Sequence, residues 1–243
     1  MTELPATQSR QKKLVVFGAL TVAVSYGMAR FALGLTTPRI VEDQIVTEAH
    51  IGYASSLSFF TYVIACFISG VLLKRGKWKI SIFAVLVTAG VGSLLVAIST
   101  SALIFMAGIG VAGAAAGFTS GAIAYRLTRE VSPRWESRAQ AIANAGTGVG
   151  VALATGLLLA TSSWRFVYAT ASVLAVIFCL FFVFQKTKTG QVTPVAADNS
   201  DVTGSWRYLV VPIILTLLMG AGSSAYWTFG RSLAESTVGL SEF

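Results

Sequence analysis

Arg30 is a permanent cation inside an otherwise apolar and small-residue stretch, SYGMARFALG at positions 25–34. An arginine near the middle of a membrane helix costs about 2.5 to 3.5 kcal/mol on insertion scales, so it requires a polar environment or a counter-ion. Its planar fork of donors matches a carboxylate. Tyr26 lies one helical turn earlier on the same face, so the two side chains are expected to form one polar patch.

Two interpretations of Arg30 are open at this point. In the first, it faces an aqueous cavity and pairs with an anionic substrate or a substrate carboxylate. In the second, it snorkels toward the outer headgroups or caps carbonyl groups of a neighbouring helix. No Asp or Glu occurs inside any apolar segment of the chain. A buried partner for Arg30 must therefore come from the substrate or from a helix outside this sequence, and a proton relay of membrane carboxylates is not supported.

Other polar or aromatic residues in apolar surroundings extend the candidate site. Asn144 is included because a primary amide in hydrocarbon must be paired. Tyr226 and Trp227 are included, although aromatic rings near a helix end also suit an outer-interface belt. Nearby Ser223 and Ser224 are better explained as interhelical hydrogen-bond partners. The predicted substrate-binding residues are Arg30, Tyr26, Asn144, Tyr226 and Trp227.

Residues for metal or cofactor chemistry are sparse. His50 is the only histidine, lies in an expected loop without a ligand cluster, and is interpreted as a solvated or capping residue. Cys66 and Cys179 are the only cysteines, and both fall inside expected helices as packing residues. We expect no metal, no cofactor and no enzymatic activity, since a membrane enzyme needs a cluster of acids, histidines or a nucleophile with its base.

The elements that position these residues are membrane helices. Of the 243 residues, 55% are hydrophobic and 12% charged, and the mean hydropathy is +0.74, far from the average of soluble domains. The apolar residues form segments long enough to cross a bilayer, without the alternation of barrel strands. The sequence predicts an all-α polytopic bundle with seven transmembrane helices, at 14–37, 51–73, 80–99, 103–125, 139–161, 164–184 and 208–230.

The net charge of +8 raises the question of nucleic-acid binding, but the basic residues follow the membrane. With the amino terminus in the cytoplasm, 14 of the 18 Lys and Arg residues fall on that side, three fall on the other, and Arg30 lies within a helix. Such a bias indicates a cytoplasmic amino terminus. We expect a multi-pass protein of the cell (inner) membrane whose partners are a small-molecule substrate and the lipid bilayer, with no nucleic acid.

The polar stretch at 185–207 divides six helices from one. It is rich in Thr, Asp, Gly and Ser and is interpreted as a cytoplasmic linker. The tail after the seventh helix resembles the start of an outer loop, so a missing C-terminal half is a further expected partner. The predicted organisation is a cytoplasmic tail at 1–13, a six-helix half at 14–184, the linker at 185–207, a seventh helix at 208–230 and a truncated outer loop at 231–243.

Two rows of glycine predict close helix packing. Gly108, Gly110 and Gly113 match the spacing of a dinucleotide-binding loop, but they lie inside a long apolar segment rather than after a strand. The fourth and fifth helices instead carry small residues at four-residue spacing, which lets neighbouring backbones approach in lipid. They also suit surfaces along which helices slide. The packing residues are Gly113, Gly117, Gly121, Gly146 and Gly150, with Gly156 further along.

The loop GVLLKRGKWKIS resembles a degenerate form of the G-x-x-x-D-R-x-G-R-R loop of the major facilitator superfamily. The matching residues are Gly70, Arg75, Gly76, Lys77 and Lys79. Lys74 replaces the expected acid, and the stretch is one residue short. In the family that acid helps to latch the two halves in one state, so the resemblance implies a loop here without the same latch. Met106 stands where the family often has arginine.

The first helix gives the closest resemblance. YGMARFALGLTTP is similar to the G-x-G-R-F-A-x(5)-P signature of the YbfB/YjiJ-like bacterial transporters, with Ala29 in place of the second glycine. The resemblance implies a 12-helix carrier of two six-helix halves, with a cavity lined mainly by the first, fourth, seventh and tenth helices.

The leading hypothesis is a secondary transporter of a small organic solute that works by alternating access. A non-transporting truncated carrier, acting as a membrane remnant or assembly partner, is the alternative. A retinal receptor is excluded because 208–230 contains no lysine.

Overall fold

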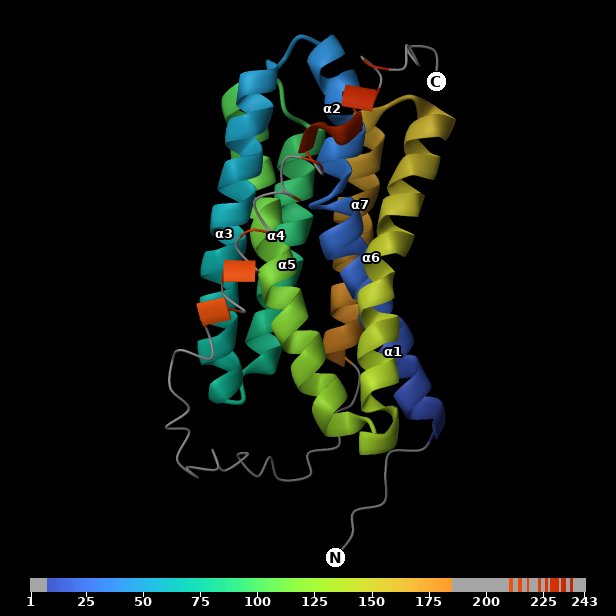
Figure 1. Cartoon of the computed structure of the whole chain (residues 1–243). Coiled ribbons are helices and arrows are strands. Elements are labelled where there is room, and N and C mark those ends of the chain that lie inside the picture. Colours follow the sequence, from blue (N-terminus) through green and yellow to red (C-terminus); the bar gives the residue numbers. More distant parts are fainter. Residues whose placement is uncertain are drawn as a thin grey trace, which may run out of the picture.

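The chain folds as a bundle of long helices, described here by a computed structural model for residues 8–184 and for single positions between 210 and 237 (Figure 1). No strand occurs among the described residues, so the all-α prediction is confirmed. The helical elements are α1 Gln8–Val22, the π-helical segment η1 Ala23–Met28, α2 Ala32–Glu42, α3 Glu48–Lys74, α4 Trp78–Ala97, α5 Ala102–Glu130, α6 Pro133–Thr161 and α7 Trp164–Phe184.

Six helical spans in the described residues are long and apolar enough to cross a membrane. The first of them, Ser9–Glu42, combines α1, η1 and α2. These spans correspond to the first six predicted ones, but the helices run past the apolar cores. For example, α6 begins at Pro133 rather than at 139, because hydropathy registers only the lipid-embedded part of a helix.

The described positions between 210 and 237 are helical and fall largely in the predicted seventh span. Trp227, the predicted linker 185–207 and the first seven residues of the predicted tail 1–13 lie outside the described residues, and the rest of that tail is the start of α1. Contacts that connect the described positions to the bundle include two hydrogen bonds. The hydroxyls of Ser55 and Thr228 lie 2.7 Å apart and are buried, and Nη1 of Arg231 donates to the carbonyl oxygen of Leu35 at 2.5 Å.

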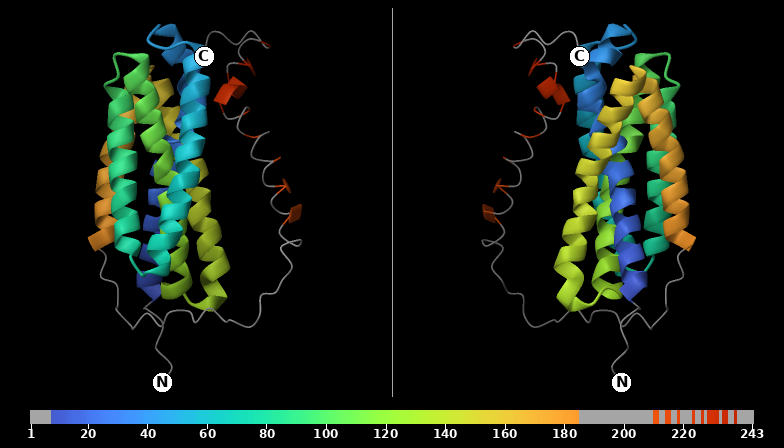
Figure 2. Two further views of the ribbon diagram at one scale, coloured as in Figure 1. Left: turned by 90° about the vertical axis from the view of Figure 1, so that its left-hand side faces the viewer. Right: turned by 90° about the vertical axis from the view of Figure 1, so that its right-hand side faces the viewer.

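Consecutive spans run in opposite directions through short connections at 43–47, 75–77, 98–101, 131–132 and 162–163. The views in Figure 2 show the helices nearly parallel, with these connections gathered at the two ends of the bundle. α5 packs mainly against α3 and α4, α4 also packs against α7, and α1 with η1 packs against α6. The first span is therefore held from the side by α6, and α5 lies at the centre of the other half of the bundle.

Local sequence fixes where these helices begin and turn. Thr47 precedes α3, and its backbone N–H donates to Nδ1 of His50 at 3.2 Å, so the only histidine in the chain has a capping role. Pro133 occupies the first turn of α6, where a missing N–H is tolerated. Gly76 between α3 and α4 has a φ of 70°, a left-handed conformation that glycine adopts without steric cost.

Glycines set the distance between α5 and α3. A β-carbon added at Gly117 would lie 2.5 Å from the carbonyl oxygen of Tyr62, and one at Gly121 would lie 2.8 Å from Oγ of Ser69. At Gly113 it would overlap the backbone of Ser58. The first glycine row therefore forms the face of α5 on which α3 lies, at a separation that only a hydrogen atom at Cα allows.

A second close contact joins the first span to α6. A β-carbon at Gly146 would collide with the carbonyl of Ala19, and one at Gly150 with the carbonyl of Ala23. The contact is reciprocal, because a β-carbon at Gly27 would lie 2.5 Å from Cα of Gly150. Gly156 has open space around it and takes no part. The glycines of both helices thus place α6 directly against the π-helical segment that precedes Arg30.

Candidate functional site

Arg30 lies at a break in the first membrane span. In η1 the backbone hydrogen bonds skip five residues, from the N–H of Ala29 to the oxygen of Val24 at 2.8 Å and from the N–H of Phe31 to the oxygen of Tyr26 at 2.9 Å. Regular α-helix resumes only at Ala32. Single-turn π segments inside α-helices are rare, and those that occur are often found at functional sites. The break changes the helical register at the position where the chain carries its cation.

Four aromatic rings surround the guanidinium of Arg30. The Cζ atom of Arg30 lies 4.1 Å from the ring centroid of Tyr62 and 4.6 Å from that of Phe59, both on α3. It lies 5.4 Å from the ring of Phe31 and 5.9 Å from that of Tyr26. All four distances fall within the range of cation–π attraction, which stabilises a cation that has left water. We call Tyr26, Phe31, Phe59 and Tyr62 the aromatic shell.

The aromatic shell compensates the charge of Arg30 only in part. No carboxylate of the described residues forms an ion pair with it, since the ion pairs found there join Arg10 and Arg126 to Glu130 and Arg39 to Glu42. Its Nε atom is buried and has no hydrogen-bond partner among the described residues. Buried polar atoms are normally paired, so this donor stays available to a polar or anionic group beyond the described residues.

The two tyrosines of the shell are joined to each other. The hydroxyl of Tyr26 donates to the hydroxyl oxygen of Tyr62 at 3.3 Å, and their rings meet edge to face. The predicted pairing of Tyr26 with Arg30 in one polar patch therefore exists in the structure, with Tyr62 as an additional member. Both tyrosines are half-buried, so their hydroxyls can still reach a bound solute.

A hollow of about 490 Å³ adjoins the aromatic shell at the upper part of α3. Phe59 belongs to both, because it borders the hollow and also contacts Arg30. The volume lies in the range of small-molecule pockets. The residues that line the hollow are Ala49, Gly52, Tyr53, Ser55, Ser56, Phe59, Thr228 and Phe229.

Two other predicted site residues do not join Arg30. Asn144 is exposed on α6. Gly146 is level with Ala19, so Asn144 is level with about residue 17, which places it roughly 20 Å from Arg30 along the bundle axis at 1.5 Å per residue. Tyr226 is 72% exposed and is not one of the rings around Arg30. Trp227 lies outside the described residues, so its assignment stays a prediction.

Sequence reasoning missed Phe59 and Tyr62. Both lie on a helix rich in exposed aromatic and aliphatic residues, where rings suggest contact with lipid rather than a site. The available signal was their spacing of three, which puts two rings on one face of α3. Arg30 lies in the preceding span, and no apolar segment contains an acid that could pair with it. That was the reason to look for a face of this kind.

A second buried arginine lies near the opposite end of the bundle and is fully compensated. Arg126 is 2% exposed, and its Nε and Nη2 atoms bind the two carboxylate oxygens of Glu130 at 2.6 and 3.0 Å. Arg10 approaches the same carboxylate at 3.6 Å, and Arg126 lies 4.6 Å from the ring of Trp78. This cluster connects the start of α1 to the end of α5.

The residues of the basic loop motif lie at the same end. Arg75, Lys77 and Lys79 are exposed at the turn between α3 and α4, and Lys79 lies 5.8 Å from the ring of Trp78. Gly70 has open space around it, and Gly76 adopts the left-handed conformation of the turn. The motif residues thus form a charged, solvent-facing turn.

The described helices define a polytopic membrane protein, with six long apolar spans and a cation that has no carboxylate partner among the described residues. The sequence model of the Major Facilitator Superfamily matches residues 19–242, and the chain belongs to this family. A search of curated proteins found no match. The chain is therefore a multi-pass membrane transporter, since members of this family are transporters rather than enzymes.

Proposed function

We propose that this protein is a secondary-active transporter of a small organic anion, with Arg30 as the residue that binds the anionic group. The observation that carries the proposal is the buried Nε of Arg30, which lacks a partner among the described residues in a site that holds four rings and no carboxylate. A bound carboxylate would accept from the guanidinium and satisfy it in one step.

The charge of the site favours a monoanion. Within the six spans that the structure describes, the apolar segments predicted from sequence contain Arg30 and, at the very start of α7, Arg165. Nη1 of Arg165 already donates to the carbonyl oxygen of Ala97 at 2.9 Å. One free cation in apolar surroundings balances one negative charge, whereas a second charge on the solute would remain uncompensated at a large desolvation cost.

Alternating access is the transport mode that fits the fold. The cation lies at a break near the middle of the first apolar span, and transporters of several folds hold their substrates near the bilayer midplane. The membership in the YbfB/YjiJ-like branch and the cytoplasmic amino terminus in an inner membrane are part of the same proposal, supported by the signature around Arg30 and by the distribution of basic residues.

The test is uptake or efflux of radiolabelled solutes by cells or vesicles that contain the protein. The panel comprises monocarboxylates, dicarboxylates and neutral analogues of the same size. We expect transport of monocarboxylates that falls at least tenfold in Arg30→Ala and less in Arg30→Lys, because lysine keeps the charge but not the planar fork. The control is Arg39→Lys, an exposed arginine paired with Glu42. Normal anion transport by both Arg30 variants would refute the assigned role.

A further inference from the structure

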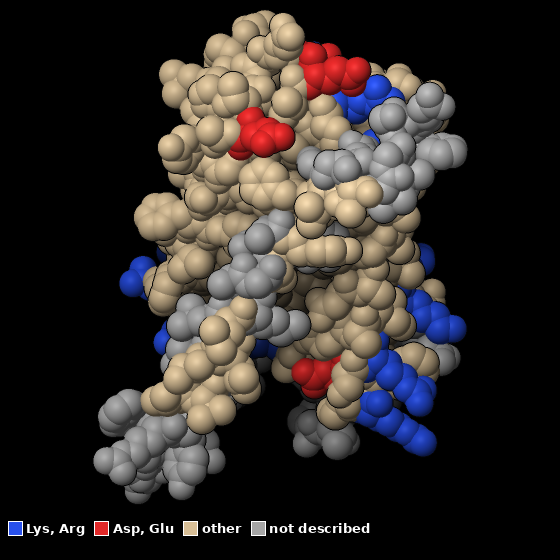
Figure 3. All heavy atoms as spheres, turned by 45° about the horizontal axis from the view of Figure 1, so that its top comes forward, with Lys and Arg blue, Asp and Glu red and all other residues tan. Residues whose placement is uncertain are grey.

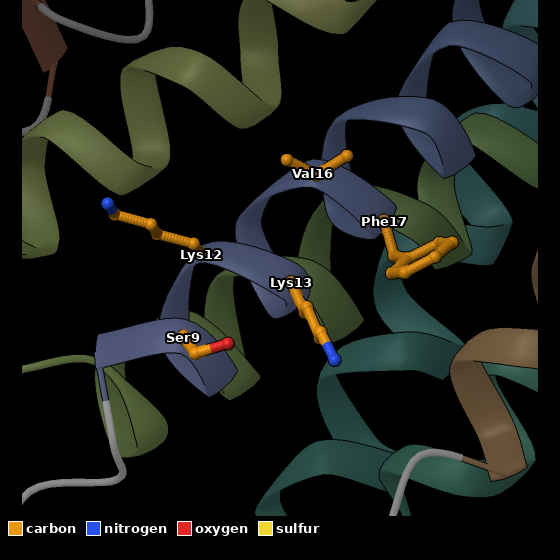
Figure 4. Close-up of a pocket in the computed structure, with 5 residues that line it drawn as sticks. All are labelled: Ser9, Lys12, Lys13, Val16 and Phe17. Atoms are coloured by element: carbon orange, nitrogen blue, oxygen red, sulfur yellow. The ribbon is translucent and has the colours of Figure 1, made fainter.

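A second hollow, of about 480 Å³, lies at the beginning of α1, far from the aromatic shell (Figure 4). Its lining residues are Ser9, Lys12, Lys13, Val16 and Phe17. Their spacing of three, four, seven and eight residues puts all five on one face of the helix. We call them the lysine stripe. It is polar at its lower end and apolar one to two turns further on.

The two positive charges of the lysine stripe are not neutralised by any residue that the structure describes. Lys12 and Lys13 are exposed, and neither has an ion-pair or hydrogen-bond partner among the described residues. Arg10, the next residue after Ser9, already pairs with Glu130 at 3.6 Å. The stripe therefore offers two ammonium groups and the hydroxyl of Ser9 to an anion from outside.

The apolar end of the lysine stripe is built to contact hydrocarbon. The ring of Phe17 stacks on Phe181 of α7, with centroids 3.9 Å apart and an interplanar angle of 24°, which fixes it as a flat wall. Val16 beside it is 51% exposed. From Ser9 to Phe17 the stripe extends about 12 Å along the helix axis, a distance comparable with the step from headgroup to acyl chain.

We propose that the lysine stripe is a binding site for an anionic phospholipid. The phosphate accepts from the hydroxyl of Ser9, and an acyl chain follows Val16 and Phe17. The side chains of Lys12 and Lys13, which extend to different sides of α1 in Figure 4, rotate toward the phosphate when it binds. A free phosphate ion would use only the lower end of the stripe, so the apolar end favours a lipid. Basic pockets at the membrane surface beside transmembrane helices recognise lipid headgroups through the same chemistry.

The test compares lipid binding to the purified full chain by native mass spectrometry. The probes are phosphatidylglycerol and phosphatidylcholine with identical acyl chains, and glycerol 3-phosphate as the headgroup alone. A lysine near a membrane surface contributes about fivefold in affinity for anionic lipid, so Lys12→Gln/Lys13→Gln is expected to weaken phosphatidylglycerol binding roughly 25-fold. Phosphatidylcholine binding should not change, and Lys12→Arg/Lys13→Arg should restore binding of phosphatidylglycerol.

The matched control is Lys74→Gln/Lys77→Gln, which removes the same charge from exposed positions at the same end of the bundle. An equal loss in the control would overturn the proposal, since net charge rather than the stripe would then govern binding. The proposal would also be overturned if glycerol 3-phosphate displaced phosphatidylglycerol at a concentration equal to that of the lipid, because the acyl chain would then contribute nothing to binding. Val16→Asn, which removes only the apolar contact, should weaken the lipid without affecting any binding of glycerol 3-phosphate.

Discussion

At the scale of single residues, the half-buried Arg30 and the buried Arg126 have opposite surroundings. Arg126 has a bidentate carboxylate from Glu130, whereas Arg30 has four rings and a buried Nε without a partner among the described residues. The first arrangement is self-sufficient and holds α1 to α5. In the function proposed above, an anionic solute completes the second. This contrast is the physical reason to assign structure to Arg126 and ligand binding to Arg30.

The self-sufficient pair yields a stability prediction. Glu130→Gln removes the carboxylate that binds the buried guanidinium, and breaking a buried pair in this way costs about 3 kcal/mol. We expect Tm in detergent to fall by several degrees, while transport by the surviving folded protein changes little. The control is Glu136→Gln, an exposed carboxylate that accepts from the hydroxyl of Thr128 at 2.7 Å. Equal Tm losses in the two variants would contradict the structural assignment of the cluster.

At the scale of helices, much of the architecture was predictable from the sequence. Apolar length gave the spans, and the two glycine rows indicated close packing, although the sequence did not say which helix lies against each row. The structure shows α3 against the Gly113 row and α1 with η1 against Gly146 and Gly150. Pairing depends on the register between distant segments, which no local pattern encodes.

The interruption at η1 was not predictable. Its residues AVSYGM are compatible with an ordinary helix, and a π-helical turn has no composition of its own. It arises where Gly27 and Gly150 bring two backbones together, a tertiary event. The position of Arg30 within the aromatic shell depends on the register that follows this break, whereas Phe59 and Tyr62 on α3 were missed because their rings suggested contact with lipid. Asn144 was included in the predicted site because of its amide group alone. Its position along α6 places it far from Arg30 on the bundle axis.

The contact between α1 and α6 yields the second prediction. Gly150→Ala places a methyl group on the carbonyl of Ala23, a backbone atom that cannot move aside, and overpacking of this kind costs about 1 to 3 kcal/mol. We expect a lower Tm and reduced transport, because the strain falls on the segment that carries Arg30. Gly148→Ala is the matched control two residues away, where an added β-carbon meets nothing within 4 Å. A harmless Gly150→Ala would show that the helices are further apart.

At the scale of the whole molecule, the basic residues are distributed unequally between the two ends of the bundle. In Figure 3 most of the visible basic groups lie in the lower half of the molecule, and acidic groups appear at the top and near the lower edge. The basic residues of the described part that belong to the lower end are Arg10, Lys12, Lys13, Lys74, Arg75, Lys77, Lys79, Arg126, Arg129, Arg134 and Arg138. The upper end has Arg39, Arg165 and Arg231.

This asymmetry predicts which end faces the cytoplasm, since basic loops stay on that side during insertion. We expect Glu42→Cys, at the upper end, to react with a membrane-impermeant maleimide in intact cells. Lys77→Cys, at the lower end, should react only after the cells are opened. The background for both is Cys66→Ser/Cys179→Ser, which removes the two native thiols. The reverse labelling pattern would show that the amino terminus lies outside the cell. The lysine stripe would then face the outer leaflet, while the chemistry of Arg30 would be unchanged.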